Sequence, residues 1–427
     1  MHEKRKSLSN KNIWRVAFFL AFRQVKRAGL WTTMLIIAVM TLTFLNLVVV
    51  NGVLVGLIQS SVEAQRDRGT SDVVVTKLAQ KDQIEHSQDI LNVLKGLSDV
   101  VAVSPRYTAS GSLNADYLKK LTQNEVPNKI NGTFAGIDPV VENSITNISK
   151  YIVEGTYLDE NDVDGILIGA NFLYKYTPIE VSGFQTLKNI SIGQKLKLVI
   201  NGNSKEVIVR GVIKSKVDDN DFRIFMLGSE LRKLINRPDI NYDEMAIKLL
   251  PGATEVDAAR IKQYLLNNNF DEGAKIQTYV EAQPKFLKDM AATFGLLGNM
   301  IGTIGLAVAS ITIFIVIFVN AITRRKFIGI LKGIGVHPKA IEVSYIFQSI
   351  FYAVTGSVIG LAILYGFLVP FIDAHPINFP FSDGILYAPY FGTSLRVLAL
   401  LITTVIAGYI PARMIVTKNT LDAILGR

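Results

Sequence analysis

Few side chains in this 427-residue sequence have the types and spacing that catalysis needs. The phosphate-binding loop GxxxxGK[ST], the zinc motif HExxH, the nucleophile motif GxSxG and the redox motif CxxC are all absent. The sequence has no cysteine and four scattered histidines, which leaves no disulfide framework, zinc-thiolate site or thiol nucleophile. We therefore predict a non-catalytic chain that binds no metal, nucleotide or other cofactor itself.

Acidic residues also lack the placement that ion chemistry needs. Asp218, Asp219 and Asp221 offer the oxygen ligands that calcium prefers, but they lack the spacing of a calcium loop, so a solvated turn is favoured. The long apolar segments contain asparagine and threonine but no acid. Ion-coupled transporters place carboxylates or histidines inside the membrane, so an ion-driven transporter is disfavoured.

One short stretch is unusual: RRKFIGILKGIG, residues 324–335, places bases and glycines between two long apolar segments. Its apolar residues Ile328, Ile330, Leu331 and Ile334 could form one face of a short amphipathic helix. Such a helix would suit docking onto a soluble partner. From composition alone, an ordinary basic loop beside a membrane is the favoured interpretation.

Four apolar segments are long enough to cross a bilayer, whose core takes about 20 apolar residues in a helix. We predict transmembrane helices within 31–58, 291–322, 345–369 and 397–412. The first two segments exceed the length that a bilayer needs, so they should project from it as stalks. The first segment is also too long for the apolar core of a cleaved signal peptide.

The distribution of bases predicts the orientation. Bases gather in residues 1–30, in the loop 323–340 and in the tail 413–427. The positive-inside rule places these regions in the cytoplasm and the short loop 370–396 outside. Outside the three basic regions acids outnumber bases, so the net charge of +9 reports topology and gives no support to nucleic-acid binding. Residues 1–30 mix apolar and basic positions, which is typical of an amphipathic helix on membrane lipids.

Residues 59–290 are predicted to form one large extracytoplasmic α/β domain between the first two spans. Helical spacing of apolar residues occurs near 84–97 and again in EVDAARIKQYLL. Two β-rich runs flank Asn201-Gly202, which indicates a hairpin. The fold class is therefore an α-helical membrane protein with four transmembrane helices and a large α/β insert. Glycines four residues apart, which let helices approach closely, suggest packing sites at Gly298, Gly302, Gly356 and Gly360.

Several of these stretches resemble the MacB/FtsX-type ABC permeases, specifically MacB/LolC/LolE-like members without a fused ATPase. Residues 324–336 resemble the coupling-helix motif R-R-x-E-I-G-I-L-[RK]-x-x-G-[AV], with Phe327 at the usual Glu position. The C-terminal GYIPAR resembles the family pattern G-x-x-P-A-R…P-x-x-A-L, although Thr420 stands where Pro is usual. The matching C-terminal residues are Gly408, Pro411, Ala412, Arg413 and Ala423. FAGIDP and residues 153–173 and 192–213 resemble the periplasmic core domain.

The resemblance implies a mechanism and partners. Such permeases pair with an identical or sister chain and contact a separate dimer of cytoplasmic P-loop ATPases, which binds ATP and magnesium. Movement of the ATPase would pass through the coupling helix to a porter-like outer domain, with an inserted subdomain near 107–205. The coupling residues would be Arg324, Arg325, Lys326, Phe327, Ile328, Gly329, Ile330, Leu331, Lys332, Gly333 and Gly335.

The resemblance also implies an inner (plasma) membrane location and export or extraction of a lipoprotein, lipid, peptide or drug-like substrate. A periplasmic adaptor and an outer-membrane channel could complete the route. Two alternatives stay open. An FtsX-like regulator of cell-wall hydrolases would export nothing, although its outer domain would be smaller. A membrane-anchored sensor or binding module would need no ATPase and no coupling motif.

Overall fold

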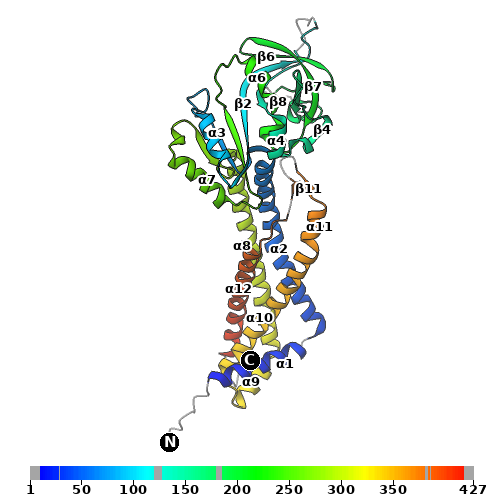
Figure 1. The fold of residues 1–427 in the computed structure, drawn as a ribbon. Helices are drawn as coiled ribbons and strands as arrows, with labels where there is room; N and C mark the ends of the chain where they lie inside the picture. The colour runs from blue at the N-terminus through cyan, green and yellow to red at the C-terminus, as the bar shows by residue number, and fades with distance from the viewer. Residues whose placement is uncertain are drawn as a thin grey trace. The chain divides into compact units, whose positions relative to one another are not determined.

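The computed structural model describes residues 10–27, 29–119, 127–178, 185–379, 383–384 and 386–417. The chain forms two compact units (Figure 1). The helical unit comprises residues 1–58, 289–377 and 384–427, and the α/β unit comprises residues 59–288 and 378–383. Within the described residues four helices are long and apolar enough to cross a membrane, and the α/β unit is inserted between the first and second. The predicted fold class is confirmed.

Each long helix extends beyond the segment that hydropathy predicts. The four are α2 (Leu30–Gln65), α8 (Lys285–Thr323), α10 (Pro338–Ile363) and α12 (Tyr390–Val416). α10 continues through a π-helical turn, η5 (Leu364–Leu368), into α11 (Val369–Ala374). The helices are longer than their apolar stretches because helix ends are set by local features such as capping residues and proline, and not by hydropathy. At the start of α10, for example, His337 Nδ1 accepts a hydrogen bond from Lys339 N and Pro338 takes the first turn.

Two shorter helices complete the helical unit. α1 (Asn10–Arg27) lies beside α10, and α9 (Arg325–Gly333) connects α8 with α10 (Figure 1). The apolar core of the unit takes residues from α2, α8, α9, α10 and α12. The amphipathic helix predicted for residues 1–30 is therefore present over the described residues 10–27.

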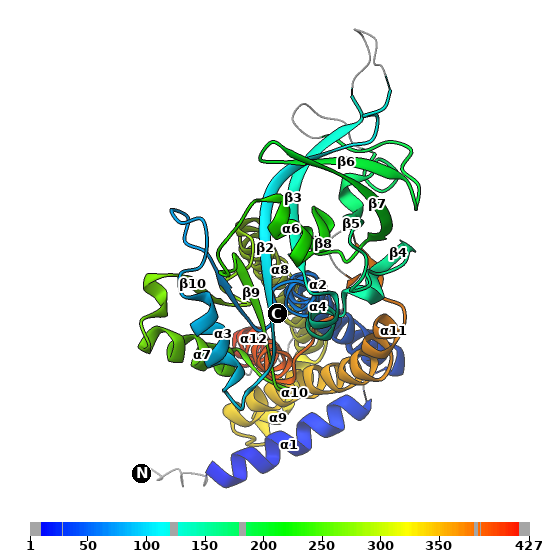
Figure 2. The same cartoon turned by 45° about the horizontal axis from the view of Figure 1, so that its top comes forward.

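The α/β unit is built on a sheet with the strand order β10-β1-β9-β2-β3-β8-β5-β7-β4, in which β6 pairs with β2 and β7. The strands are β1 (Val73–Thr76), β2 (Val100–Asn114), β3 (Lys129–Ile137), β4 (Ile152–Gly155), β5 (Gly165–Gly169), β6 (Lys195–Ile200), β7 (Asn203–Ile213), β8 (Arg223–Leu227), β9 (Glu244–Leu249) and β10 (Lys275–Thr278). β2 is long enough to serve two lobes (Figure 2): its first half pairs with β9 and its second half with β3 and β6.

Each lobe has its own apolar core. In the first lobe, α3 (Ser87–Lys95) and α7 (Glu255–Asn267) cover β1, β9 and β10. In the second lobe, α4 (Pro139–Thr146) and α6 (Gly228–Leu234) accompany the remaining strands. The boundary expected at 205 falls inside β7, and β8 and α6 also belong to this lobe. The lobe therefore ends later than expected, because β6 and β7 form one hairpin that cannot be divided.

Two kinds of local sequence signal in the α/β unit are confirmed: the helical spacing of apolar residues and the hairpin turn. Both helical patterns form helices, and α7 begins with a capping box between Thr254 and Asp257. The Asn201-Gly202 pair connects β6 to β7, and both residues have positive φ angles of 49° and 83°. These angles are those of a two-residue type I′ hairpin turn.

Candidate functional site

α9 is an amphipathic helix with two differently used faces. Ile328 and Leu331 are buried in the core of the helical unit, together with Ala412 and Ile415 of α12. Phe327, Ile330 and Ile334 are instead 50%, 51% and 73% exposed. The expectation that Ile328, Ile330, Leu331 and Ile334 share one face is therefore wrong. Their spacing does not decide between the core and the outside, since both faces of this helix carry apolar residues.

Two of the three bases of α9 lie at the end of the helix where they stabilise it least. Arg325 and Lys326 occupy the first turn, which contains no acid, and they face the positive end of the helix dipole. Phe327 takes the third helical position, where an acid would be favourable, and presents an exposed ring instead. Helix stability does not explain these three residues, so they are candidates for contact with a partner or the membrane surface.

The C-terminal end of α9 is closed by backbone geometry that requires glycine. Gly335 has a φ of +94°, which side-chain-bearing residues rarely adopt. Gly335 N donates to Lys332 O at 3.1 Å, and Val336 N donates to Leu331 O at 3.0 Å. These two bonds form a Schellman motif with Gly335 at its left-handed position. By contrast, Gly333 is exposed, and a Cβ atom there would meet nothing within 4 Å.

Lys332 joins α9 to the end of α12. Its Nζ donates a hydrogen bond of 2.7 Å to Val416 O, in the last turn of α12. A cation at this position satisfies a free carbonyl and lies at the negative end of the α12 dipole. Together with the buried Ile328 and Leu331, this contact makes α9 part of the helical unit rather than a mobile loop.

The predicted packing glycines all face α2. A Cβ on Gly356 would lie 2.5 Å from Met40 Cβ, and one on Gly360 would overlap the ring of Phe44. Thr41 Oγ1 donates to Gly356 O at 3.2 Å, so α10 and α2 are in close backbone contact. Gly298 and Gly302 of α8 face Asn51 and Leu47, also on α2. Both glycine pairs therefore pack helices within one chain.

The C-terminal motif residues have separate roles in α12. Gly408 packs against Ser349 of α10, leaving no room for a side chain. Pro411 lies inside α12 and cannot donate to the preceding turn, while Ala412 is fully buried. Arg413 Nη1 donates to the Tyr409 hydroxyl at 2.9 Å. Thr420 and Ala423 lie outside the described residues.

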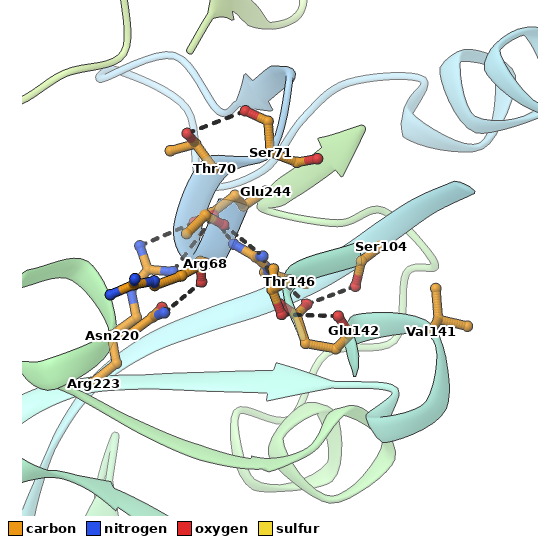
Figure 3. Close-up of polar contacts among 12 residues, drawn as sticks. Arg68, Thr70, Ser71, Ser104, Val141, Glu142, Thr146, Asn220, Arg223 and Glu244 are labelled. Carbon is orange, nitrogen blue, oxygen red and sulfur yellow. Dashed lines mark hydrogen bonds and ion pairs between the residues drawn. The ribbon is translucent and has the colours of Figure 1, made fainter. Parts of the chain in front are cut away.

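A buried ion network lies in the α/β unit at the junction of its two lobes (Figure 3). Arg106 of β2 is 2% exposed and donates two hydrogen bonds to Glu142 of α4, at 2.7 and 2.8 Å. Its remaining guanidinium nitrogen donates to Glu244 of β9 at 2.5 Å. Arg223 of β8 pairs with the same Glu244 at 3.1 Å. Two bases and two acids thus balance one another in a largely buried cluster.

Hydrogen bonds from neighbouring hydroxyls complete the network. Ser104 Oγ donates to Glu142 at 2.7 Å, and Thr146 Oγ1 donates to it at 3.1 Å (Figure 3). Burial alone would raise the pKa of Glu244, but the guanidinium groups of Arg223 and Arg106 outweigh it and lower that pKa to about 2. Glu244 therefore stays ionised at neutral pH, and the network holds α4, β2, β8 and β9 together.

The turn that follows α2 is fixed to this network. α2 passes directly into a π-helical turn, η1 (Arg66–Thr70), and Gly69 O accepts a hydrogen bond of 3.0 Å from Arg106. Arg66 donates to Asp72 at 2.6 Å and lies over the ring of Tyr279. Arg68 donates to Ser215 O at 2.7 Å. The last residues of α2 and the sheet consequently form one rigid piece.

The acidic run near residue 218 also helps to fix the end of α2 to the α/β unit. Asp218–Asp221 forms a short helix, α5, rather than an exposed turn. Asp219 accepts a 2.7 Å hydrogen bond from Gln65 at the end of α2. Asp221 accepts hydrogen bonds from the backbone N–H groups of Ser215 and Lys216. The expected solvated turn is thus wrong for Asp221, which is buried, and its carboxylate orders the neighbouring loop.

Two ion pairs of Asp383 hold part of the loop after α11 within the α/β unit. This loop carries the short strands β11 (Ile377–Asn378) and β12 (Asp383–Gly384). Asp383 contacts Lys216 Nζ at 2.5 Å and Arg68 at 3.6 Å. Partial burial raises the pKa of Asp383, but the two cations outweigh this effect and hold the pKa below its ordinary value.

Comparisons with known proteins connect the helical unit to a family. Residues 299–420 match the family described as FtsX-like permease C-terminal. The ABC transporter permease YtrF of Bacillus subtilis (strain 168) is 30% identical over 181 residues, which are 38% of this chain and 39% of YtrF. The uncharacterized ABC transporter permease MJ1507 of Methanocaldococcus jannaschii is 23% identical over 281 residues, which are 64% and 65% of the two chains. The chain spans less than two thirds of the length of either relative.

Two solved structures each resemble about half of this chain weakly. The periplasmic region of MacB from Actinobacillus actinomycetemcomitans aligns with a TM-score of 0.34 and 15% identity over 52% of this chain and 97% of that one. The extracellular domain of the noncanonic ABC-type transporter YknZ from Gram-positive bacteria aligns with a TM-score of 0.31 and 13% identity, over 49% and 100%.

The matched residues 299–420 contain α9, α10, α12 and most of the apolar part of α8. They hold the two-faced helix, the Schellman motif at Gly335, and the glycines of α10 and α12 that pack against other helices. Over this region the chain is similar to the FtsX-like permease family.

Proposed function

We propose that this chain is the membrane permease subunit of an ABC transporter that works with a separate cytoplasmic ATPase. The two curated relatives are named ABC transporter permeases, which supports this class. The observation that carries the proposal is the structure of α9. One face is fixed in the helical unit through Ile328, Leu331 and Lys332. The other face exposes Phe327 and Ile330, beside the bases in the first turn of the helix.

α9 is suited to receive a push from a soluble partner. An exposed apolar stripe flanked by bases can dock into an apolar groove with an acidic rim. Because Lys332 bonds the last turn of α12 and the buried residues contact the core, displacement of α9 must move α10 and α12 as well. ATP and magnesium would bind to the partner, and closure of an ATPase dimer would bias two states of the permease.

The α/β unit would receive the movement through α2. The end of α2 is locked to the sheet by Gly69, Arg106 and Arg66, so a shift of the helix is not absorbed by a flexible linker. In the proposed orientation both termini and α9 are cytoplasmic, and the α/β unit lies outside the inner (plasma) membrane. The permease would act as a dimer with an identical or sister chain.

The proposed work is export or extraction of a substrate already outside the membrane. The proposed substrate class is a lipoprotein, lipid, peptide or drug-like molecule. A periplasmic adaptor and an outer-membrane channel would be added where the cell has an outer membrane. The size of the α/β unit, residues 59–288, supports a substrate-handling domain over a small regulatory one.

Purification of the full chain from its native membranes tests the proposal. A soluble P-loop ATPase should remain bound at a fixed ratio. Ile330→Asp should remove it, because the carboxylate would be buried at the docking face without a partner. Val256→Asp is the matched control, since Val256 is 77% exposed on α7. A folded wild-type protein that retains no ATPase would overturn the proposal in favour of a regulator, sensor or binding module.

A further inference from the structure

An apolar groove lies between α1 and α10, apart from the surface proposed for the ATPase. Its volume is about 400 Å³, within the range of roughly 300–1,000 Å³ typical of small-molecule sites. The lining is almost wholly apolar, with Lys26 as the single charged residue among those described. The lining residues are Phe18, Ala21, Phe22, Val25, Lys26, Phe347, Ile350, Phe351, Val354 and Thr355.

The two walls of the groove, α1 and α10, are held together by contacts next to the groove. Gln348 Nε2 of α10 donates a hydrogen bond to Gln24 Oε1 of α1, and both amides are buried. Phe347 receives Trp14 and Phe18 edge-on, each at 5.7 Å between ring centroids. A buried amide pair is costly to separate because each partner would lose its hydrogen bond. The groove is therefore a built feature of the α1–α10 contact.

The charge around the groove has one sign. Lys26 and Arg27 end α1, both are exposed, and α1 contains no acid. A ligand that fits must combine an apolar chain for the aromatic floor with an anionic group near the Lys26 ammonium. A phospholipid with a net negative headgroup has both parts, and the amphipathic, basic character of α1 is typical of helices at the interface where such lipids lie.

We propose that this groove is a specific site for an anionic phospholipid, with one acyl chain against Phe22 and Phe351 and the phosphate near Lys26. A second copy of this chain is the competing occupant, because exposed apolar helix faces also form dimers. A two-fold interface brings the same patch from each copy together. It would place Lys26 of each copy close to a base of the other, so the charge favours the lipid.

Native mass spectrometry of the full-length protein with added lipid tests the site. Phosphatidylglycerol should be retained in preference to phosphatidylcholine with the same acyl chains. Lys26→Gln should weaken that retention roughly fivefold, the equivalent of about 1 kcal/mol for one base near an anionic surface. Arg15→Gln is the matched control, because Arg15 is exposed on the same helix but does not line the groove.

A second variant tests the contribution of the apolar groove separately from that of the Lys26 charge. Val354→Trp should fill the groove and remove the retained lipid, while Lys26 stays in place; size-exclusion chromatography checks that the protein remains folded. Equal retention of the two lipids, or equal losses from Lys26→Gln and Arg15→Gln, would overturn the site. Efficient disulfide crosslinking of two chains through Val354→Cys would also overturn it and assign the groove to a dimer interface. None of these outcomes depends on an ATPase.

Discussion

Gly335 shows how one backbone angle can fix the end of a helix. Its φ of +94° allows the Schellman motif that ends α9 and starts the chain toward α10. A Cβ meets no neighbouring atom there, so the cost of a side chain comes from the backbone alone. The residue is therefore a clean site for testing whether the geometry of α9 matters to function.

We predict that Gly335→Ala destabilises the end of α9 by about 1–2 kcal/mol, the usual cost of a left-handed alanine. Gly333→Ala should be neutral or slightly stabilising, because Gly333 is the last residue of a right-handed helix and has open space around it. Thermal unfolding in detergent and substrate-stimulated ATPase activity of the reconstituted complex measure the two effects. Equal behaviour of the variants would show that the left-handed angle is not limiting.

Arg106 is the central residue of the buried network, since it bonds Glu142, Glu244 and Gly69. We predict that Arg106→Met lowers the free energy of opening of β2 by about 3–5 kcal/mol, because two carboxylates lose their buried partner. Hydrogen exchange of β2 amides in the full chain measures this free energy. Arg260→Met is the control: its side chain is 61% exposed, and loss of its ion pairs should cost less than about 1 kcal/mol.

The network should also make the α/β unit sensitive to acid. Glu244 has a folded-state pKa of about 2, below the ordinary 4.5, so its ionised form is favoured by folding. Its contribution to stability is complete above pH 4.5 and is lost as the pH falls from 4.5 toward 2. Denaturation of the wild type should weaken across this window. Glu244→Gln should be less stable at neutral pH, and the difference between the two proteins should shrink as the pH falls.

At the scale of elements, close packing of α10 on α2 depends on two glycines. Gly356→Leu should force α10 away from α2, because the backbone at Met40 and Thr41 leaves no space for a side chain. Overpacking of this kind costs about 1–3 kcal/mol or more. Gly295→Leu, in α8 with nothing within 4 Å, is the control. The effect should appear as a lower unfolding temperature of the chain itself; a change in subunit association alone would contradict packing within one chain.

Another prediction at this scale concerns the loop between α11 and α12. Asp383 is joined to Lys216, whose side chain also bonds Asn378 at 2.7 Å. Asp383→Asn should increase hydrogen exchange and protease cleavage in residues 375–384, more at low salt, where the native ion pair is strongest. Asp373→Asn changes an exposed acid of the same region and should have no effect. Unchanged protection in Asp383→Asn would show that the ion pair does not hold the loop.

At the scale of the whole molecule, the long helices and the α/β unit are continuous in the chain. α2 reaches its π-helical turn without a glycine- or proline-rich linker, and that turn is fixed by Arg66, Arg68 and the carbonyl of Gly69. The proposed coupling of α9 to the α/β unit through α2 requires this continuity of α2 with the turn.

Much of this architecture could be predicted from the sequence because its signals are local. The four apolar segments and the Asn201-Gly202 turn each depend on neighbouring residues. The helix in the 324–335 stretch was also predictable, and α9 occupies Arg325–Gly333. Its two faces were not, since the apolar residues of both faces have helical spacing and only packing decides which are buried.

The ion network could not be predicted, because its members are brought together by strand pairing. Arg106 is 36 residues from Glu142 and 138 from Glu244, and no spacing rule relates them. The only signal was a charged residue in an otherwise β-rich run. The end of the second lobe was missed partly for the same reason: besides the β6–β7 hairpin, β8 belongs to the lobe through its long-range pairing with β3. The sequence by itself determined the apolar segments, their order and the position of the basic stretch 324–335, because hydropathy and turn chemistry act over a few residues. Only the tertiary structure decided which charges are buried together and which face of α9 remains free, because these depend on contacts between distant segments.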